Sequence, residues 1–337
     1  MQPTRSIVID RFIASQGWGN AKRDSITADA SFRHYYRLIK ENGAKAILMD
    51  APTETEDVKP FIAVASHLLK LGFSTPKILA TDIKNGIIIL EDLGNETYTY
   101  LLANNYDELE LYKLATEVLI NLHRIPCKSV LPHGVPNYNE TRILEEVDRL
   151  NVWYIPMVTG STPKKSVREK YLDIWRTILP EAWKVPSSLI LFDYHVDNLL
   201  LLRKRIGIKA CGLLDFQDAV FGPVTYDLMS LLEDARRDVD ETIIMEMKKL
   251  YQKSFPHIDT TDFENSWSIM AAQRHIRVIG TFARLSMRDN KSIYLENLPR
   301  LWGYMESCLE NPILYSLRHW LYDNVPVQHR KTNAYEK

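Results

Sequence analysis

The chain has 337 residues, 45% of them hydrophobic and 25% charged, which is the composition of a folded globular protein long enough for two lobes. Its 42 basic and 43 acidic residues leave a net charge of −1, so composition does not indicate nucleic acid or an anionic membrane as a partner. Three scattered cysteines form no metal or disulfide pattern, and neither a signal peptide nor a membrane-length apolar run is present. We therefore expect a cytoplasmic protein.

The N-terminal part reads as a small sheet with accompanying helices. Helical periodicity with glycine stop signals predicts helices at 5–16 and 60–72. Short runs bounded by Asn-Gly turns predict strands at 26–38, 44–49, 77–81 and 87–90. An acidic loop, 91–94, follows the last of them.

The remainder is mostly helical. Apolar residues at helical spacing predict helices at 107–122, 141–179 with a break near Pro156, from 226 onward, and at 240–254, 262–288, 296–310 and 312–322. No internal repeat or low-complexity tract appears. These patterns predict an α+β fold with a small antiparallel sheet followed by a larger helical part.

The stretch from 187 to 228 interrupts the helical pattern and carries the candidate chemistry. Three apolar runs, 189–192, 199–202 and 208–214, adjoin polar residues that a strand does not require, namely Asp193, Asn198 and Asp215. A hairpin of the second and third runs would return Asn198 and Asp215 to the same end, where one ion could touch both. Singly these residues could cap turns, but together they favour a metal-assisted site.

Oxygen ligands of this kind suit phosphoryl transfer. A loop carboxylate such as Asp193 can accept a hydroxyl proton, while the amide of Asn198 and the carboxylate of Asp215 hold Mg²⁺ on nucleotide phosphates.

The same residues resemble a known family. Asp193–Leu199 is similar to the catalytic loop of the aminoglycoside phosphotransferase family, small-molecule relatives of protein kinases. Leu214–Leu232 and Asp29–Arg37 resemble the metal-binding and N-terminal segments of its anomeric sugar kinase branch, which acts on N-acetylmuramate and N-acetylglucosamine in cell-wall recycling. One departure is Leu191, where the wider family has a histidine.

The resemblance implies a protein-kinase-like bilobal fold, with a nucleotide-binding lobe at 1–93 and a catalytic and substrate-binding lobe at 94–337. It implies ATP and Mg²⁺ as cofactors, Asp193 as the proton acceptor, His195 as a brace of its loop, and Asn198 and Asp215 as metal ligands. The positions that the resemblance assigns to nucleotide binding are Ser31, Phe32, Arg33, Tyr35, Arg37, and the backbone at Glu91 and Leu93. Asp227 is expected to hold the catalytic loop in shape.

The segments expected to bind the ATP phosphates differ from the corresponding segments of protein kinases. The loop Ala28–Tyr35 contains no glycine, so the Ser31 and Arg33 side chains are expected to contact phosphate. The third strand carries Met49 where a kinase has a lysine. Lys45, Arg33 and Arg37 remain open as replacements for that charge.

The acceptor is a small molecule that the resemblance does not fix. Gln217 and Asp218 directly follow the metal aspartate, Asp215, and are therefore expected near the acceptor. Arg274 or Arg284 could neutralise an anionic group such as the lactyl carboxylate of N-acetylmuramate. The default interpretation of these two arginines is a solvated helix face. An aminoglycoside or another small alcohol is the alternative acceptor, and a nucleotide-binding pseudokinase acting through partners is the alternative class. A metal-dependent phosphohydrolase would need more clustered carboxylates. The oligomeric state is left open.

Overall fold

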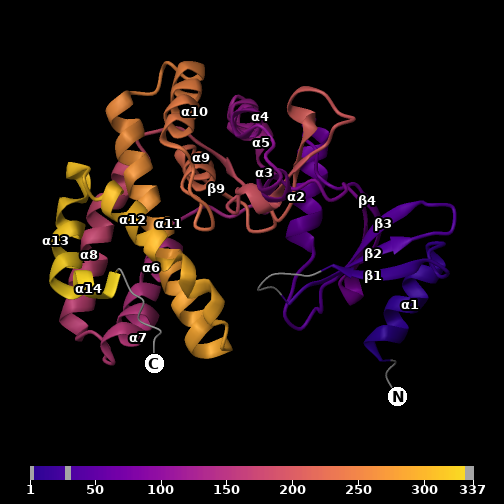
Figure 1. Cartoon of the computed structure of the whole chain (residues 1–337), viewed down its shortest axis with the longest axis horizontal. Coiled ribbons are helices and arrows are strands. Elements are labelled where there is room, and N and C mark those ends of the chain that lie inside the picture. The colour runs from indigo at the N-terminus through magenta and orange to yellow at the C-terminus, as the bar shows by residue number, and fades with distance from the viewer. Residues whose placement is uncertain (1–3, 27–31, 331–337) are drawn as a thin grey trace. The chain divides into compact units, whose positions relative to one another are not determined.

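The computed structural model describes residues 4–26 and 32–330 (Figure 1). The chain divides into two compact units that alternate along the sequence. The first comprises Met1–Val118, Pro132–Val135 and Val196–Ala219, and the second comprises Leu119–Leu131, Pro136–His195 and Val220–Lys337. The boundary between His195 and Val196 therefore falls inside the predicted catalytic loop. The functional division expected at residue 93 stays a prediction.

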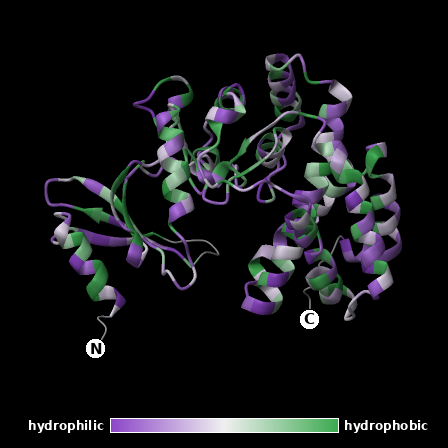
Figure 2. Cartoon of the chain, turned by 180° about the vertical axis from the view of Figure 1, so that it is seen from behind, coloured by the Kyte–Doolittle hydropathy of each residue, from purple (hydrophilic) through white to green (hydrophobic). Residues whose placement is uncertain are grey.

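The first unit contains an antiparallel sheet of five strands in the order β1-β2-β3-β5-β4 within the described residues. Its strands are β1 (Lys22–Ile26), β2 (His34–Ile39), β3 (Lys45–Asp50), β4 (Ile78–Asp82) and β5 (Ile87–Glu91). Helix α1 (Arg5–Ser15) carries both hydrophobic and hydrophilic residues (Figure 2). Its Ile9 and Ile13 share a buried cluster with sheet residues, which are Leu38, Ala46, Leu48, Ile87 and Ile89.

Helix α2 (Lys59–Lys70) supports the segment that carries Asp215. Phe61 of α2 stacks on the buried Phe216 ring, with centroids 5.2 Å apart and planes 16° apart. The hairpin β7 (Leu199–Leu201) and β8 (Cys211–Leu213) belongs to the same unit, as does helix α3 (Tyr98–Ala103). The stack fixes the backbone directly after Asp215, because an aromatic pair of this area resists reorientation.

The second unit is built around α11 (Thr260–Asp289), which is buried along most of its length. It packs against α6 (Glu140–Val147), the π-helical turn Leu150–Tyr154, α8 (Lys165–Ala182), α9 (Thr225–Leu232) and α12 (Leu298–Cys308) (Figure 1). Strands β6 (Ser187–Ile190) and β9 (Val220–Pro223) pair antiparallel. The other helices are α5 (Cys127–Val130), α7 (Ile155–Thr159), α10 (Glu241–Ser254), α13 (Tyr315–Asn324) and α14 (Val327–Arg330), while α4 (Glu108–His123) spans the boundary between the units.

The structure confirms the predicted α+β class, the small antiparallel sheet and the helices, but the sheet includes a fifth strand, β1, that precedes the predicted runs except at Ile26. It corrects the run 26–38, because β1 ends at Ile26 and β2 begins only at His34. It also shortens the run 208–214: Gly207–Ala210 forms a 3₁₀ turn, and strand β8 keeps only Cys211–Leu213. Strand β9 was not predicted. Among the described helices, none has both the length and the apolar character that crossing a membrane requires.

Candidate active site

Asp193 follows a tight turn at the end of β6. The Asp193 N–H donates to the Leu191 carbonyl at 3.0 Å, and the residue between them, Phe192, has a φ of 75°. A three-residue turn with positive φ on a bulky side chain is strained and needs support from its surroundings.

Asp227 of α9 supplies that support. Its carboxylate accepts hydrogen bonds from the backbone N–H of Leu191 at 2.6 Å and of Phe192 at 3.0 Å. The Phe192 ring stacks on Tyr226, with centroids 5.3 Å apart and planes 3° apart. Burial raises the pKa of Asp227 to about 7, and the two backbone hydrogen bonds oppose that rise. Asp227 thus holds the turn in the strained conformation that presents Asp193.

Asp193 lines a cavity of about 170 Å³ in the second unit, which we call the arginine cavity. Its lining holds four arginines and one carboxylate among the described residues, namely Arg149, Arg236, Arg274, Arg277 and Asp193, with His195 beside them. Charge in this cavity is therefore strongly positive around the predicted proton acceptor.

Arg277 is the lining arginine that the structure relates most directly to the catalytic turn. Its Nη2 lies 3.8 Å from Asp193 Oδ1, and its guanidinium lies 4.3 Å from the centre of the Phe192 ring. Only Arg274 and Arg284 were predicted from the sequence as candidates on this helix, so Arg277 was missed. Its separation of three residues from Arg274 on one helix was the available signal, because residues i and i+3 share a face.

Arg149 enters the cavity from the π-helical turn region because α11 has a glycine opposite it. A Cβ on Gly280 would lie 2.5 Å from the Arg149 Cβ and 2.6 Å from its carbonyl carbon. Arg149 Nη1 donates to Thr281 Oγ1 at 2.9 Å. A side chain at position 280 would push this segment away, so the glycine permits the close approach that places Arg149 in the lining.

His195 is buried, and burial together with the positive charges of Arg236, Arg274 and Arg277 keeps its pKa well below the ordinary value. Its ring is therefore neutral near pH 7. A neutral imidazole fits the predicted bracing role, which stays a prediction.

The predicted hairpin is confirmed in the first unit. Strands β7 and β8 pair with Leu199 opposite Leu213, and the Leu214 N–H donates to the Asn198 carbonyl at 2.9 Å. Asn198 and Asp215 consequently lie at the same end of the hairpin. Asp215 has a φ of 56°, another positive value at a predicted site residue.

The role of Asp215 as a Mg²⁺ ligand stays a prediction. Gln217 Nε2 donates to Asp215 Oδ1 at 2.9 Å, and Asp218 is exposed. The described residues contain no group of three or more His, Cys, Asp or Glu side chains that could hold a metal. An ion here would take the oxygens of Asn198 and Asp215 and complete its shell with phosphate and water, as Mg²⁺ commonly does.

Arg33 is held close to Asp215 by a carboxylate that the sequence analysis did not select. Its Nε and Nη2 lie 2.9 and 2.8 Å from Glu56 Oε2, and its Nη1 lies 3.9 Å from Asp215 Oδ1. Burial by itself would lower the pKa of Arg33, but Tyr35, Glu56 and Asp215 raise it overall. Arg33 is thus a fixed cation beside the predicted metal ligand.

Arg37 does not contact Asp215 in the described structure and instead pairs with Asp92. Its Nε donates to Asp92 Oδ2 at 2.6 Å and its Nη2 to Asp92 Oδ1 at 3.0 Å, in the loop after β5. The Glu91 N–H donates to the Lys77 carbonyl at 2.8 Å, and Leu93 is half-buried. Of the two candidate arginines for the missing lysine, Arg33 is therefore the one beside Asp215, while Lys45 is exposed at the start of β3.

The other predicted positions have varied surroundings. Burial raises the pKa of Tyr35 to about 12, so it stays a neutral phenol, while Phe32 is 63% exposed. Ser31 lies outside the described residues. Arg274 lines the arginine cavity, whereas Arg284, half-buried on the same helix, is not part of its lining.

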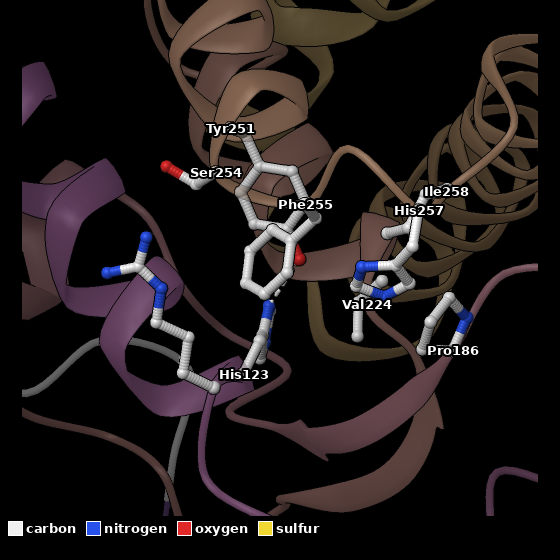
Figure 3. Close-up of a pocket in the computed structure, with 9 residues that line it drawn as sticks. His123, Pro186, Val224, Tyr251, Ser254, Phe255, His257 and Ile258 are labelled. Atoms are coloured by element: carbon white, nitrogen blue, oxygen red, sulfur yellow. Dashed lines mark hydrogen bonds between the residues drawn. The ribbon is translucent and has the colours of Figure 1, made fainter.

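A second cavity, of about 290 Å³, contains none of the predicted site residues (Figure 3). His123 and Tyr251 line it and join through a 2.7 Å contact between Nδ1 and the phenol oxygen. Burial lowers the pKa of His123 to about 3. A neutral, hydrogen-bonded histidine of this kind contributes to the packing of the fold.

The sequence profile of the phosphotransferase enzyme family matches residues 24–263. The chain belongs to this family. The match spans the sheet, the hairpin and the catalytic turn, so the protein is an enzyme that transfers phosphoryl groups, and the family resemblance drawn from the sequence is confirmed.

Two named relatives are similar to this chain along nearly its whole length. An N-acetylmuramate/N-acetylglucosamine kinase from Caulobacter vibrioides is 32% identical, covering 95% of this chain and 96% of its own. A protein of the same name from Pseudomonas aeruginosa is 33% identical, covering 90% and 89%. The crystal structure of a choline/ethanolamine kinase family protein from Mesorhizobium loti has the same fold, with a TM-score of 0.61, 14% identity, and coverage of 94% and 100%. The protein-kinase-like fold class is thereby confirmed.

Proposed function

We propose that this phosphotransferase uses ATP and Mg²⁺ to phosphorylate the anomeric C1 hydroxyl of an amino sugar. The bond between the γ-phosphorus and the β,γ-bridging oxygen breaks, a bond forms between that phosphorus and the sugar O1, and ADP leaves. Asp193 orients the hydroxyl and accepts its proton. The observation that carries the proposal is Asp193 itself: its carboxylate follows a strained turn that Asp227 holds in place, and it lines a cavity rich in arginine.

The residues of the first unit are proposed to bind the nucleotide. Asn198 and Asp215 would hold Mg²⁺, whose charge screens the phosphates from the incoming hydroxyl. Arg33, fixed by Glu56, would supply the cation that kinases place on the third strand. The adenine would be read at the loop after β5, through the Glu91 carbonyl and the Leu93 backbone.

The name of the relatives supports an amino sugar as the acceptor, and the charge of the cavity supports it over an antibiotic. Aminoglycosides are polycations and require an acidic acceptor site. The lining of the arginine cavity has the opposite sign, with four arginines against one carboxylate. An aminoglycoside would meet repulsion there, since like charges in a partly desolvated site cost several kcal/mol.

Phosphorus NMR of reactions containing ATP and Mg²⁺ tests the proposal. The acceptor panel comprises N-acetylmuramate, N-acetylglucosamine, choline and an aminoglycoside. We expect a new sugar-phosphate resonance with the amino sugars and stoichiometric ADP. The product should no longer reduce a dye, because a phosphate at C1 removes the reducing end. A phosphorylated sugar that still reduces the dye would exclude C1 transfer, and transfer only to choline or the antibiotic would exclude the sugar.

A further inference from the structure

We propose that the arginine cavity binds a carboxylate substituent of the acceptor, so that the enzyme selects acidic amino sugars over neutral ones. This inference rests on the proposed sugar kinase function and names its preferred substrate class. The matched pair of sugars that decides it is N-acetylmuramate and N-acetylglucosamine, which differ only in the lactyl ether on the oxygen at C3.

The charge of the arginine cavity supports an anionic ligand. Arg274 is 2% exposed, and the Nε–H groups of Arg274 and Arg277 are buried with no hydrogen-bond partner in the described part of the chain. Buried cations without full pairing are costly, and an anion that enters the cavity offsets that cost. Burial and the charge of Arg277 lower the pKa of both Arg274 and Arg149, while Asp234 and Asp193 act in the opposite direction on Arg274 and Glu146 does so on Arg149.

Some of the carboxylates near the cavity are already engaged in other contacts. Glu146 acts on Arg149 and Arg277, but its oxygens accept hydrogen bonds from Tyr138 at 2.7 Å, Gln273 at 2.9 Å and Arg142 at 3.0 Å. Asp193 is the carboxylate of the lining, and its proposed task requires it to face the sugar hydroxyl. The buried Asp234 also acts on Arg274, so the arginines are partly compensated, yet among the described residues the lining of the cavity itself holds four arginines against the single carboxylate of Asp193.

The volume of the arginine cavity supports a small acidic substituent as its ligand. At about 170 Å³, the cavity is smaller than the roughly 300–1,000 Å³ of pockets that enclose whole ligands. It suits an acidic arm of a sugar better than the ring. The C1 hydroxyl and the C3 ether are separated by one ring carbon, so both substituents of one sugar can lie within reach of a cavity that contains Asp193.

The competing explanation is that the arginines bind the phosphoryl group during transfer. The two explanations differ in what a substitution does to the two sugars. A carboxylate subsite predicts a selective loss with N-acetylmuramate, because N-acetylglucosamine has no group to place there. Phosphoryl binding predicts equal losses with both.

The experiment measures kcat/KM for both sugars in the wild type, in Arg274→Gln and in Arg236→Gln. Arg274 is buried, whereas Arg236 is half-buried and its replacement should fold. We expect the wild type to prefer the acidic sugar, and each variant to lower the acid-to-neutral ratio about tenfold or more, which is the usual effect of losing a hydrogen bond to a charged group. Arg288→Gln is the matched control: Arg288 lies on the same helix but is exposed and pairs with Asp289. It should leave the ratio unchanged.

Calorimetry without ATP gives a reading that does not depend on turnover. N-acetylmuramate should bind the wild type more tightly than N-acetylglucosamine, and the advantage should shrink in Arg236→Gln. Equal ratios in wild type and variants, or equal losses with both sugars, would overturn the carboxylate subsite while leaving the sugar kinase function intact. If neither sugar is phosphorylated, the proposed function fails, and the calorimetric preference alone decides whether the cavity takes a carboxylate.

Discussion

Arginines occupy two predicted functional regions in contrasting ways. In the first unit, Arg33 and Arg37 each have a carboxylate within 3 Å, from Glu56 and Asp92 respectively. In the second unit, the arginine cavity has more arginines than carboxylates. A paired arginine is held in one position at little electrostatic cost, whereas an excess of arginines calls for an anion from outside. The first arrangement suits positioning of a nucleotide, and the second suits selection of an acceptor.

The largest expected effect comes from Asp193→Asn. The variant keeps the shape of the side chain but cannot accept the proton, so we expect kcat to fall about 10²- to 10⁴-fold, the range for loss of a general base. Binding of ATP, measured by calorimetry, should change less than about threefold, because the proposed nucleotide ligands lie in the first unit. A variant that retains more than a tenth of the activity would contradict the role of Asp193.

Arg33→Ala should weaken ATP binding about 10- to 100-fold, because a fixed cation on the phosphates is lost. Arg33→Lys should recover part of the affinity. Adenosine, which has no phosphate, should bind both variants as it binds the wild type. Arg23→Ala is the control: it removes an arginine from β1 that pairs with Asp10. Unchanged ATP affinity in Arg33→Ala would show that another group replaces the missing lysine.

Asp227→Asn tests the clamp on the catalytic turn through its pH dependence. The folded-state pKa of about 7 lies above the ordinary value of 3.8. Between these values the folded protein keeps a proton that the unfolded chain has released, so this group's contribution to stability falls as pH rises from about 4 to 7. The asparagine variant lacks that titration. Melting temperatures from pH 5 to 8 should show the wild type losing stability relative to the variant as pH rises, and a constant difference would argue against the raised pKa.

The smallest effect is expected for Arg284→Gln. Arg284 lies on the same helix as Arg274 but outside the lining of the arginine cavity. Its replacement should therefore shift the acid-to-neutral sugar ratio less than about twofold, compared with about tenfold for Arg274→Gln. Equal shifts for the two variants would mean that the anion-binding region extends further along α11 than the cavity.

Many of the helices and strands could be predicted because the spacing of hydrophobic residues indicates the type of secondary structure. The amphipathic pattern at 60–72 became α2, and the long pattern at 262–288 became α11. The run 26–38 was predicted as one strand, whereas β1 covers Lys22–Ile26 and β2 begins only at His34. Only the pairing of β1 with β2, which starts at Ile26 opposite Tyr35, shows where one strand ends and the next begins.

The candidate site was predictable to the extent that it follows from short-range pattern. Polar residues at the ends of the apolar runs 189–192, 199–202 and 208–214 identified Asp193, Asn198 and Asp215, and a hairpin was inferred from the same spacing. Glu56 and Arg277 were missed because each lies far along the chain from the residue it serves. A charge on a helix or loop reads as solvated surface until its distant partner is known.

The sequence by itself determined the α+β class, the phosphotransferase motifs and the hairpin that brings Asn198 and Asp215 to one end. These depend on the order of residues within a few turns or strands, which local periodicity records. Only the tertiary structure decided that Glu56 fixes Arg33, that Asp227 clamps the turn before Asp193, and that Arg149, Arg236, Arg274 and Arg277 line one cavity. Those relations join segments far apart along the chain, and long-range packing sets them.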